Sequence, residues 1–345
     1  MADLDAAQAA AAAKLLELIF IQRISQSIYV AAALGIADLV ADEPKSVKQL
    51  GDATGVQAPA LRRVMRALVD FGVFAQDDAG RFALTPIGEF LKADVAGSLH
   101  PAALYFGGES AAQIEGLLLH CVKTGETARQ KLFGTGEGWF ERLQKDPAEA
   151  ALFNATMTAF ATLHLTGVLE AYDFSGIKKI VDVGGGHGKN ISEILKRHPE
   201  MRGVLFDMPH AFEGGMKTIA QMGLADRCEV VSGDFFTSVP PGADAYFLSR
   251  VIHDWHDQEA IAILRVVRGA IAPEGKLILL ETMLRPAPRS LYPALSDLNM
   301  MLRPGGCERT EEEYRTIYRA AGFELTRTVE TISPTGATVI VGRPR

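Results

Sequence analysis

The sequence has few cysteines and no surplus of positive charge, and each shortage excludes a class of protein. Its three cysteines, Cys121, Cys228 and Cys307, are odd in number and far apart, so they indicate neither a disulfide framework nor a Cys-x-x-Cys metal site. Lysine and arginine number 35 against 42 aspartate and glutamate residues, which gives a formal net charge of −7. This balance argues against nucleic acid as a main partner.

Long uncharged hydrophobic runs are also missing. The alanine-rich stretch 6–13 is followed by Lys14 and Glu17, while Asp3 and Asp5 stand where a signal peptide would carry basic residues. No apolar stretch reaches the roughly 18 uncharged residues that suggest a membrane span. We therefore expect a cytoplasmic protein that has no membrane partner.

What is present is the composition of an ordinary folded protein. The 345 residues are 48% hydrophobic and 22% charged, enough for two cores of usual domain size. The pattern predicts a mostly helical domain over residues 1–100, a helical connector and pocket lid over 101–175, and an α/β domain over 176–345.

The first hundred residues predict a winged helix. Two short helices separated by a glycine turn lie within 46–70, and the runs 72–76 and 80–85 flank a turn at 77–80. Residues 46–92 hold six basic and five acidic side chains, too small a surplus to neutralise DNA phosphates. Because the preceding segment, 14–40, is apolar on most of a helix surface, we expect a structural role in dimerisation.

The stretch 180–190, Ile-Val-Asp-Val-Gly-Gly-Gly-His-Gly-Lys-Asn, organises the second half of the chain. It predicts a buried strand, a tight glycine turn and a helix that continues from Ile191. A dinucleotide fingerprint would need glycine at the sixth position from Gly184, where the chain has Lys189. The remaining pattern, Asp-x-Gly-x-Gly-x-Gly, resembles the S-adenosylmethionine (SAM) motif of doubly wound methyltransferases and lies on Asp182, Gly184, Gly186 and Gly188.

Strands alternate with helices from residue 176 onward, as in a parallel α/β sheet. A closing antiparallel hairpin is expected over 323–332 and 337–342, which makes seven strands in a Rossmann-like fold. Ligands of such sheets bind at the carboxyl ends of the strands, near the point where the strand order reverses. The five preceding strands are predicted at 179–183, 203–206, 229–232, 244–249 and 276–281.

Acidic residues end three successive strands. Asp207 follows Gly184 by 23 residues, and an acid at this place can hold the ribose hydroxyls of an adenosine. Asp234, in Gly233-Asp-Phe-Phe, could accept from an adenine amino group while Phe235 stacks on the ring. Asp182 is the third of these acids. Helix capping could explain any one acid at a strand end, but it does not readily explain all three.

A histidine follows the fourth strand, in Ser249-Arg-Val-Ile-His-Asp-Trp-His-Asp. His253 lies where a reacting group is expected, and Asp257 can cap the helix that we expect to begin at Gln258. Deprotonating a hydroxyl of pKa ~10 at neutral pH costs roughly 4 kcal/mol, so a positioned base is useful. Glu281, at the end of the fifth strand, and Glu308 could orient the imidazole.

Together these motifs resemble the O-methyltransferase family that includes plant caffeic acid O-methyltransferase, hydroxyindole O-methyltransferase and many bacterial natural-product enzymes. The resemblance covers nearly the whole chain and implies a homodimer that uses SAM and no metal, with His253 as general base between Glu281 and Glu308. The motifs are Phe153-Asn154-x-x-Met157, Asp-Val-Gly-Gly-Gly, Phe206-Asp207-Met208-Pro209, Gly233-Asp-Phe-Phe, His253-Asp-Trp and Gly-Gly-x-Glu-Arg-Thr.

The resemblance also implies a cofactor site, with one departure from the family pattern. Many relatives have a lysine four residues before the histidine, where this chain has Ser249 followed by Arg250. We include Arg250 among the expected SAM-binding residues, which are Asp182, Gly184, Gly186, Asp207, Gly233, Asp234, Phe235 and Arg250.

The acceptor pocket is less well specified. Trp139, Phe140, Phe153 and Met157 precede the glycine-rich strand and either line a pocket over it or pack in the core; Asn299 and Arg303 complete the expected substrate set. A guanidinium inside an apolar pocket needs a partner, so Arg303 could bind an anionic acceptor; the alternatives are a salt bridge to Asp297 or a place in a solvated turn.

Three functions remain open from the sequence. The first is methyl transfer from SAM to a small-molecule hydroxyl, with His253 as base. The second is transfer to the sulfur of a small thioether or thiol acid, for which a base is dispensable. The third is a winged-helix regulator that senses SAM and binds duplex DNA, which the nearly neutral wing argues against.

Overall fold

The computed structural model describes residues 5–134, 145–286 and 290–345, and the chain divides into two units. The first unit comprises Met1–Gln113 and Leu143–Ala159, and the second comprises Ile114–Arg142 and Phe160–Arg345.

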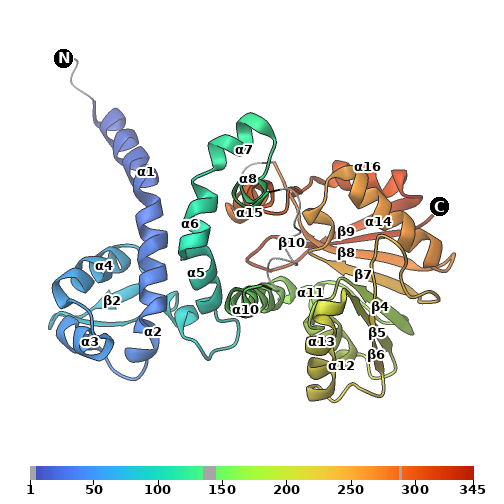
Figure 1. Ribbon diagram of the computed structural model, residues 1–345, viewed down its shortest axis with the longest axis horizontal. Coiled ribbons are helices and arrows are strands. Elements are labelled where there is room, and N and C mark those ends of the chain that lie inside the picture. Colours follow the sequence, from blue (N-terminus) through green and yellow to red (C-terminus); the bar gives the residue numbers. More distant parts are fainter. Residues whose placement is uncertain (1–4, 135–144, 287–289) are drawn as a thin grey trace. The chain divides into compact units, whose positions relative to one another are not determined.

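The first unit is mainly helical and has a small antiparallel sheet in the order β1-β3-β2 (Figure 1). Helix α1 begins after Asp5, whose carboxylate accepts from the backbone N–H of Gln8 at 2.8 Å, and α3 begins with a similar capping box at Ser46. The elements are α1 (Ala6–Ala33), α2 (Ile36–Leu39), β1 (Lys45–Ser46), α3 (Val47–Thr54), α4 (Ala58–Asp70), β2 (Phe74–Gln76), β3 (Arg81–Leu84), the 3₁₀ helix η1 (Gly88–Leu91), α5 (His100–Gly107) and α6 (Glu109–Glu115).

Apolar side chains of α1 are largely exposed in this single chain. Leu15, Leu18 and Ile19 are 55–60% exposed, so the helix has an uncovered hydrophobic surface. Two described helical stretches, Ala6–Ala33 and Pro147–Ala171, are long and apolar enough to cross a membrane. Buried helices of soluble proteins pass the same test, so this finding is weak evidence for a membrane span.

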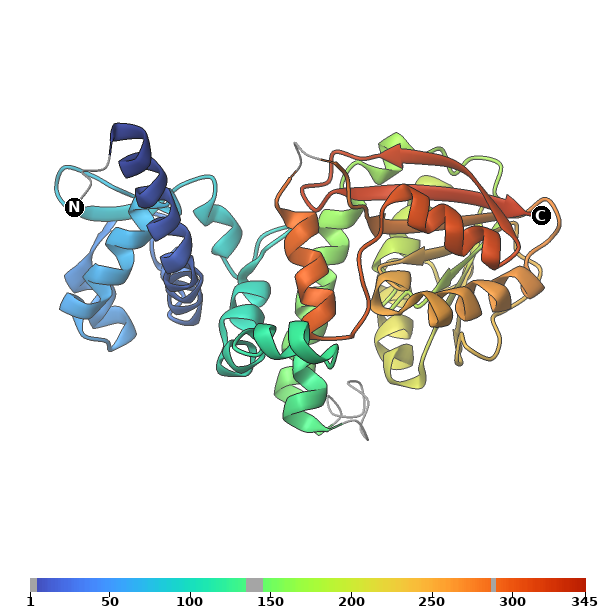
Figure 2. The same ribbon diagram turned by 90° about the horizontal axis from the view of Figure 1, so that it is seen from above.

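The second unit is built on a seven-stranded sheet in the order β6-β5-β4-β7-β8-β10-β9. The five strands β6, β5, β4, β7 and β8 pair in parallel. Strand β10 runs antiparallel between β8 and β9, at the red edge of the sheet in Figure 2. The strands are β4 (Lys179–Val183), β5 (Arg202–Asp207), β6 (Cys228–Ser232), β7 (Ala245–Ser249), β8 (Lys276–Thr282), β9 (Phe323–Glu330) and β10 (Ala337–Pro344). All seven predicted strands are confirmed.

Helices cover both faces of this sheet, because alternate strand residues point to opposite sides. Tyr246 and Leu248 belong to the core beneath α14 and α16, whereas Phe247 belongs to the core beneath α11, α12 and α13. From α7 onward the helical elements of the chain, with α10 divided between the two units, are α7 (Leu118–Thr124), α8 (Ala128–Phe133), α10 (Pro147–Leu165), α11 (Val168–Ala171), α12 (Lys189–Arg197), α13 (Pro209–Gln221), the 3₁₀ turn η2 (Ile252–Asp254), α14 (Asp257–Ala270), α15 (Tyr292–Leu302) and α16 (Glu311–Ala320).

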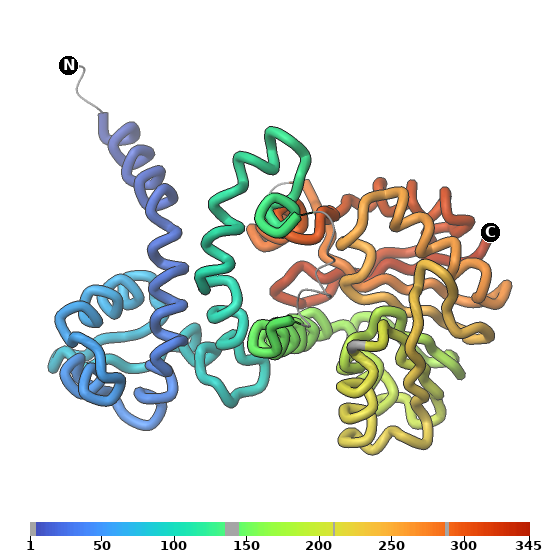
Figure 3. Tube along the Cα trace, in the orientation of Figure 1, coloured from blue at the N-terminus to red at the C-terminus, as the bar shows by residue number. Residues whose placement is uncertain are grey.

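The strand order reverses beside β4. From β4 the chain proceeds to β5 and β6 on one side, then returns to β7 on the other, a path that the tube in Figure 3 follows from green to red. The carboxyl ends of β4 and β7 therefore flank the topological switch point, where ligands of open α/β sheets bind.

Candidate active site

The glycine turn between β4 and α12 has no room for side chains at three of its positions, Gly184, Gly185 and Gly188. A Cβ on Gly185 would lie 2.6 Å from a carboxylate oxygen of Asp182, and one on Gly184 would lie 2.7 Å from the Val251 side chain. Gly184 and Gly186 also have positive φ values of 70° and 57°. The turn thus brings bare backbone to the carboxyl end of the sheet.

Asp207 meets this turn directly. One of its carboxylate oxygens accepts from the backbone N–H of Gly186 at 2.6 Å, and the other accepts from the N–H of Met208 at 2.6 Å. Asp234 follows β6 and accepts from the N–H of Phe236 at 2.8 Å. The predicted acids at the ends of β5 and β6 therefore lie as expected on the edge that carries the glycine turn.

Asp182 differs from the other two acids because it is fully buried. Neither of its carboxylate oxygens has a hydrogen-bond partner among the described residues. Burial, reinforced by the charge of Asp207, raises its pKa to about 7. Asp182 thus lies beneath the glycine turn and not on the surface that a ligand would contact.

Phe235, predicted to stack on adenine, lies within an aromatic group. Its ring centroid is 5.3 Å from that of Phe236 and 6.2 Å from that of Trp255. Gly233 is needed beside it, since a Cβ there would come within 2.7 Å of the Phe206 ring.

His253 lies on the 3₁₀ turn η2, directly after β7, and is 2% exposed. Its Nδ1 is 3.0 Å from Glu308 Oε1, which also accepts from the Ser296 hydroxyl at 2.6 Å. Glu281 Oε2 is 3.8 Å from the same Nδ1, while Glu281 Oε1 accepts from the N–H groups of Val251 and Ile252. Both predicted carboxylates therefore flank the imidazole.

This arrangement changes the pKa values of all three groups. Burial opposes a charge on His253, but the carboxylates of Glu308, Glu281 and Asp254 outweigh it and raise the pKa of His253 to about 9. Burial raises the pKa of Glu281 to about 7, whereas His253 holds the pKa of the Glu308 carboxyl below its usual value in spite of burial. With Nδ1–H donated to Glu308, Nε2 is the atom that can exchange a proton with a substrate.

The same three residues have metal-ligating atoms within 4.8 Å of one another. One oxygen of each glutamate already serves hydrogen bonds: Glu281 Oε1 accepts from backbone amides, and Glu308 Oε1 is bonded to Ser296 and His253. The second oxygens, Glu281 Oε2 and Glu308 Oε2, are buried without a hydrogen-bond partner among the described residues. The bonds of the first oxygens are enough to orient the histidine.

Arg309 and Gly306 belong to the site although the sequence did not single them out. Arg309 is 1% exposed and donates to the carbonyls of Ile252 and Trp255 at 3.2 and 2.7 Å, on either side of His253. Gly306 packs against the backbone of His253 and Asp254 so closely that a Cβ would collide with it. The sequence motif Gly-Gly-x-Glu-Arg-Thr could have identified both residues, because it contains them together with Glu308.

The prediction that Asp257 caps a helix beginning at Gln258 is wrong. Helix α14 begins at Asp257, and His256 is its N-cap residue. The Asp257 carboxylate instead accepts from Arg309 Nε at 2.9 Å, because the guanidinium is brought there by its contacts with the turn.

Arg250 is the residue before that turn and has a strained backbone. Its φ of 56° makes it the one described non-glycine residue with positive φ. The guanidinium carbon lies 5.3 Å from the Phe160 ring centroid, and Nη1 lies 3.4 Å from Nε2 of the buried His164. The sequence did not single out His164.

Arg303 pairs with a structural acid, but not with Asp297. It is 6% exposed, contacts Glu115 at 3.2 Å, and donates to the Asn299 side chain at 2.7 Å. Asp297 accepts from the backbone N–H of Glu308 at 2.9 Å. Of the remaining expected substrate residues, Trp139 and Phe140 lie outside the described residues, and Phe153 and Met157 lie in the first unit.

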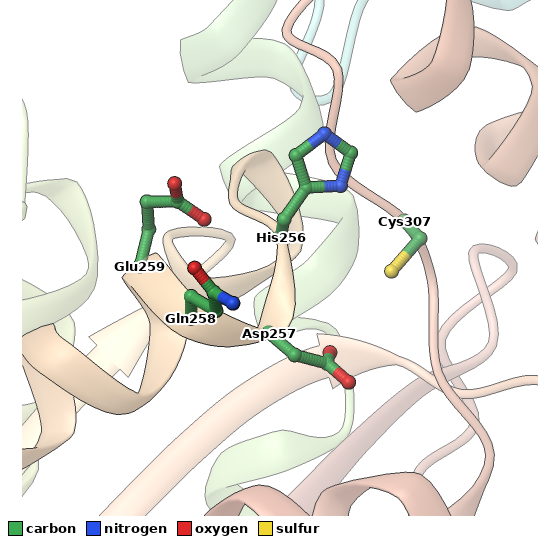
Figure 4. A pocket seen from close by; sticks show the side chains of 5 residues that line it. All are labelled: His256, Asp257, Gln258, Glu259 and Cys307. Carbon is green, nitrogen blue, oxygen red and sulfur yellow. The ribbon is translucent and has the colours of Figure 1, made fainter. Parts of the chain in front are cut away.

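A separate hollow of about 530 Å³ lies between the start of α14 and Cys307 (Figure 4). It is lined by residues that follow His253 in sequence and by the residue before Glu308, but by neither of the two themselves. Burial raises the pKa of the Cys307 thiol, so the thiol is protonated at neutral pH. The lining residues are His256, Asp257, Gln258, Glu259 and Cys307.

Comparison with known proteins gives matches along most of the chain. A model of the O-methyltransferase domain matches residues 118–324, and a model of the O-methyltransferase dimerisation domain matches residues 16–94. Phenazine O-methyltransferase PhzM of Lysobacter antibioticus is 41% identical over 330 residues, 96% of this chain and 95% of its own length.

Two further similar proteins are described by a ligand in their names or titles. The 3-amino-4-hydroxybenzoate 4-O-methyltransferase of Streptomyces cremeus is 36% identical over 304 residues, 87% of this chain and 82% of its own. The SAH-bound crystal structure of CalO1, a methyltransferase in calicheamicin biosynthesis, is 29% identical, with a TM-score of 0.86 over 99% of this chain and 100% of that one.

Proposed function

Since the chain belongs to the O-methyltransferase family and is a SAM-dependent methyltransferase acting on a small molecule, we propose that His253 is the general base for methyl transfer to a hydroxyl group. The observation that carries this proposal is the 3.0 Å contact between His253 Nδ1 and Glu308 in a buried setting. An imidazole fixed in this way can accept a proton on Nε2 once it has lost the proton that its pKa of about 9 favours at neutral pH.

The mechanism follows from this geometry. Glu308 fixes the tautomer of His253 and stabilises the imidazolium that forms when Nε2 takes the proton of the acceptor hydroxyl. Glu281 binds the N–H groups of Val251 and Ile252, and thereby fixes the turn on which His253 stands. When bound, SAM supplies an electrophilic methyl group on a sulfonium.

The cofactor fits the glycine turn, which presents bare backbone beside a carboxylate. Asp207, now bonded to the Gly186 N–H, is the proposed partner of the ribose hydroxyls. Asp234 and Phe235 are assigned to the adenine, with Gly184 and Gly233 providing close backbone approach. Asp182 supports the turn from below.

For the acceptor we infer a phenol that carries an acidic group. The relative named for 3-amino-4-hydroxybenzoate supports this class. Arg303 is a weaker anchor for the acid than the sequence suggested, because Glu115 and Asn299 already engage its guanidinium.

A cytoplasmic homodimer is the proposed state of the protein. The match to a dimerisation domain over 16–94 and the exposed apolar side chains of α1 support it. In this assignment α3, α4 and the small sheet are a winged helix with a structural role. Nothing favours the S-methyltransferase or regulator alternatives.

The test is methyl uptake from labelled SAM by a set of phenols, hydroxybenzoates and thioether acids. His253→Ala is expected to lower kcat about 10²–10⁴-fold and leave the Kd of S-adenosylhomocysteine unchanged. His256→Ala, three residues away at the hollow in Figure 4, is the matched control and should keep wild-type activity. Retained activity of His253→Ala, with a thioether acid as the best acceptor, would overturn the proposal.

A further inference from the structure

Arg250 is an ionised side chain that is held without an acidic partner. Among the described residues no carboxylate lies within ion-pair distance of its guanidinium, although Glu308 and Asp254 act on it from farther away. Its neighbours are uncharged: the face of the Phe160 ring, the Nε2 atom of His164 and the side chain of Tyr292. Arg250 is partly buried, and cations withdrawn from water are usually paired, so this exception calls for a reason.

His164 can serve Arg250 only as an acceptor. A guanidinium has donors and no acceptor, so the 3.4 Å contact requires an unprotonated Nε2 on His164. The Thr282 hydroxyl lies 3.2 Å from the same nitrogen. His164 is completely buried, and burial, together with the charge of Arg250, holds its pKa well below the usual value. His164 is therefore neutral throughout the physiological pH range.

A neutral acceptor has a different effect from a carboxylate. A glutamate at this place would fix the guanidinium and also cancel its charge. A neutral imidazole fixes the direction of one N–H bond and leaves the positive charge of Arg250 available to another anion. The positive φ of Arg250 is a second observation of this kind, because the fold keeps the residue in a backbone conformation of higher free energy.

The position of Arg250 identifies where such an anion would bind. The next residue, Val251, contacts the glycine turn at Gly184, and Glu281 binds the Val251 N–H. Tyr292 of α15 also faces the guanidinium. Arg250 thus lies between the glycine turn, η2 and α15, next to both the proposed cofactor site and the catalytic histidine.

We propose that His164 is a positioning residue that holds Arg250 as a receptor for a ligand carboxylate. The inference rests on the proposed function, which supplies two such groups: the amino-acid end of SAM and the acid of an aromatic acceptor. Both present the same planar anion to the guanidinium fork.

Calorimetry on the full-length protein distinguishes the two sources. S-adenosylhomocysteine and 5′-methylthioadenosine share the adenosine and the thioether, but only the first has a carboxylate. If the cofactor supplies the anion, His164→Leu should reduce the preference for S-adenosylhomocysteine about tenfold and leave the Kd of methylthioadenosine unchanged. If the acceptor supplies it, the variant should instead reduce the preference for 4-hydroxybenzoate over its methyl ester.

Three further variants make the result decisive. His164→Gln keeps a neutral acceptor and should restore most of the preference, while His164→Glu should abolish it by neutralising Arg250. His120→Leu, at a partly buried histidine that pairs with Glu126, is the control for loss of an imidazole. If both preferences survive in His164→Leu, the proposal is wrong; if wild-type protein does not bind S-adenosylhomocysteine, it is the proposed function that fails.

Discussion

At the scale of single residues, the site depends on ionisable groups that are buried together. His253, Glu281 and Glu308 are each 3% exposed or less, so their protonation is set by one another and not by solvent. Asp182 is a separate case, because burial and the like charge of Asp207 both raise its pKa. The consequences can be measured through pH.

The activity of the wild-type enzyme should rise with pH toward about 9. The raised pKa of His253 means that free enzyme holds a proton on this residue at neutral pH, and a base must first lose it. In Glu308→Gln the carboxylate that favours the charged imidazole is gone, so the rising limb of kcat/KM should move to lower pH while kcat falls up to about 10²-fold. If the rising limb of kcat/KM stays at the same pH in Glu308→Gln, the Glu308 carboxylate does not raise the pKa of His253.

Asp182 should make the stability of the protein depend on pH in the opposite sense from a salt-bridged acid. Its pKa is raised from 3.8 to about 7 by folding, so the folded state binds more protons in that window and stability falls as pH rises through it. The loss is roughly 4 kcal/mol for three pK units. Asp182→Asn should lack this decline when ligand-free protein is unfolded in urea at pH 5 and pH 8. Parallel pH dependence in both proteins would contradict the assignment.

At the scale of elements, one irregular segment positions the turn that carries His253. Glu308 binds the imidazole, Arg309 binds the carbonyls around it, and Gly306 lets the two backbones approach. Asp257 at the start of α14 completes the attachment through Arg309. The position of His253 is thus determined by a segment more than 50 residues later in the chain.

Gly306→Ala tests this attachment. The added Cβ must displace the turn or the segment, and a displacement of about 1 Å at a reacting group costs on the order of 10² in rate. We expect that loss in kcat, with the Kd of S-adenosylhomocysteine kept. Gly269→Ala in α14 is the control, because a Cβ there meets nothing within 4 Å and alanine suits a helix. Equal activities of the two variants would show that the close approach is unimportant.

At the scale of the whole molecule, the exposed apolar surface of α1 bears on the oligomeric state. The chain matches a dimerisation domain over 16–94, and α1 leaves Leu15, Leu18 and Ile19 more than half exposed. Exposed apolar surface of this kind is typical of an interface between subunits.

The double variant Leu15→Asp and Ile19→Asp should dissociate the proposed homodimer. Each substitution adds a charge that would have to be buried in the interface. Light scattering coupled to gel filtration should show a wild-type dimer and a variant monomer. The control is Lys14→Asp, at an exposed residue already paired with Glu17. A variant that remains dimeric would place the interface elsewhere.

The strands, the glycine turn, the acids at the strand ends and His253 could be predicted from the sequence, because each has a local pattern. The two glutamates beside His253 were implied by the resemblance to O-methyltransferases. The domain limits 1–100, 101–175 and 176–345 stay predictions. The three-dimensional packing was needed to show that Glu115 engages Arg303, that Arg309 binds the turn carrying His253, and that His164 contacts Arg250. These partners are 188, 54 and 86 residues apart. Hydrophobic periodicity and turn residues report only on near neighbours, whereas a buried charge takes whichever partner the packing of the elements brings within reach.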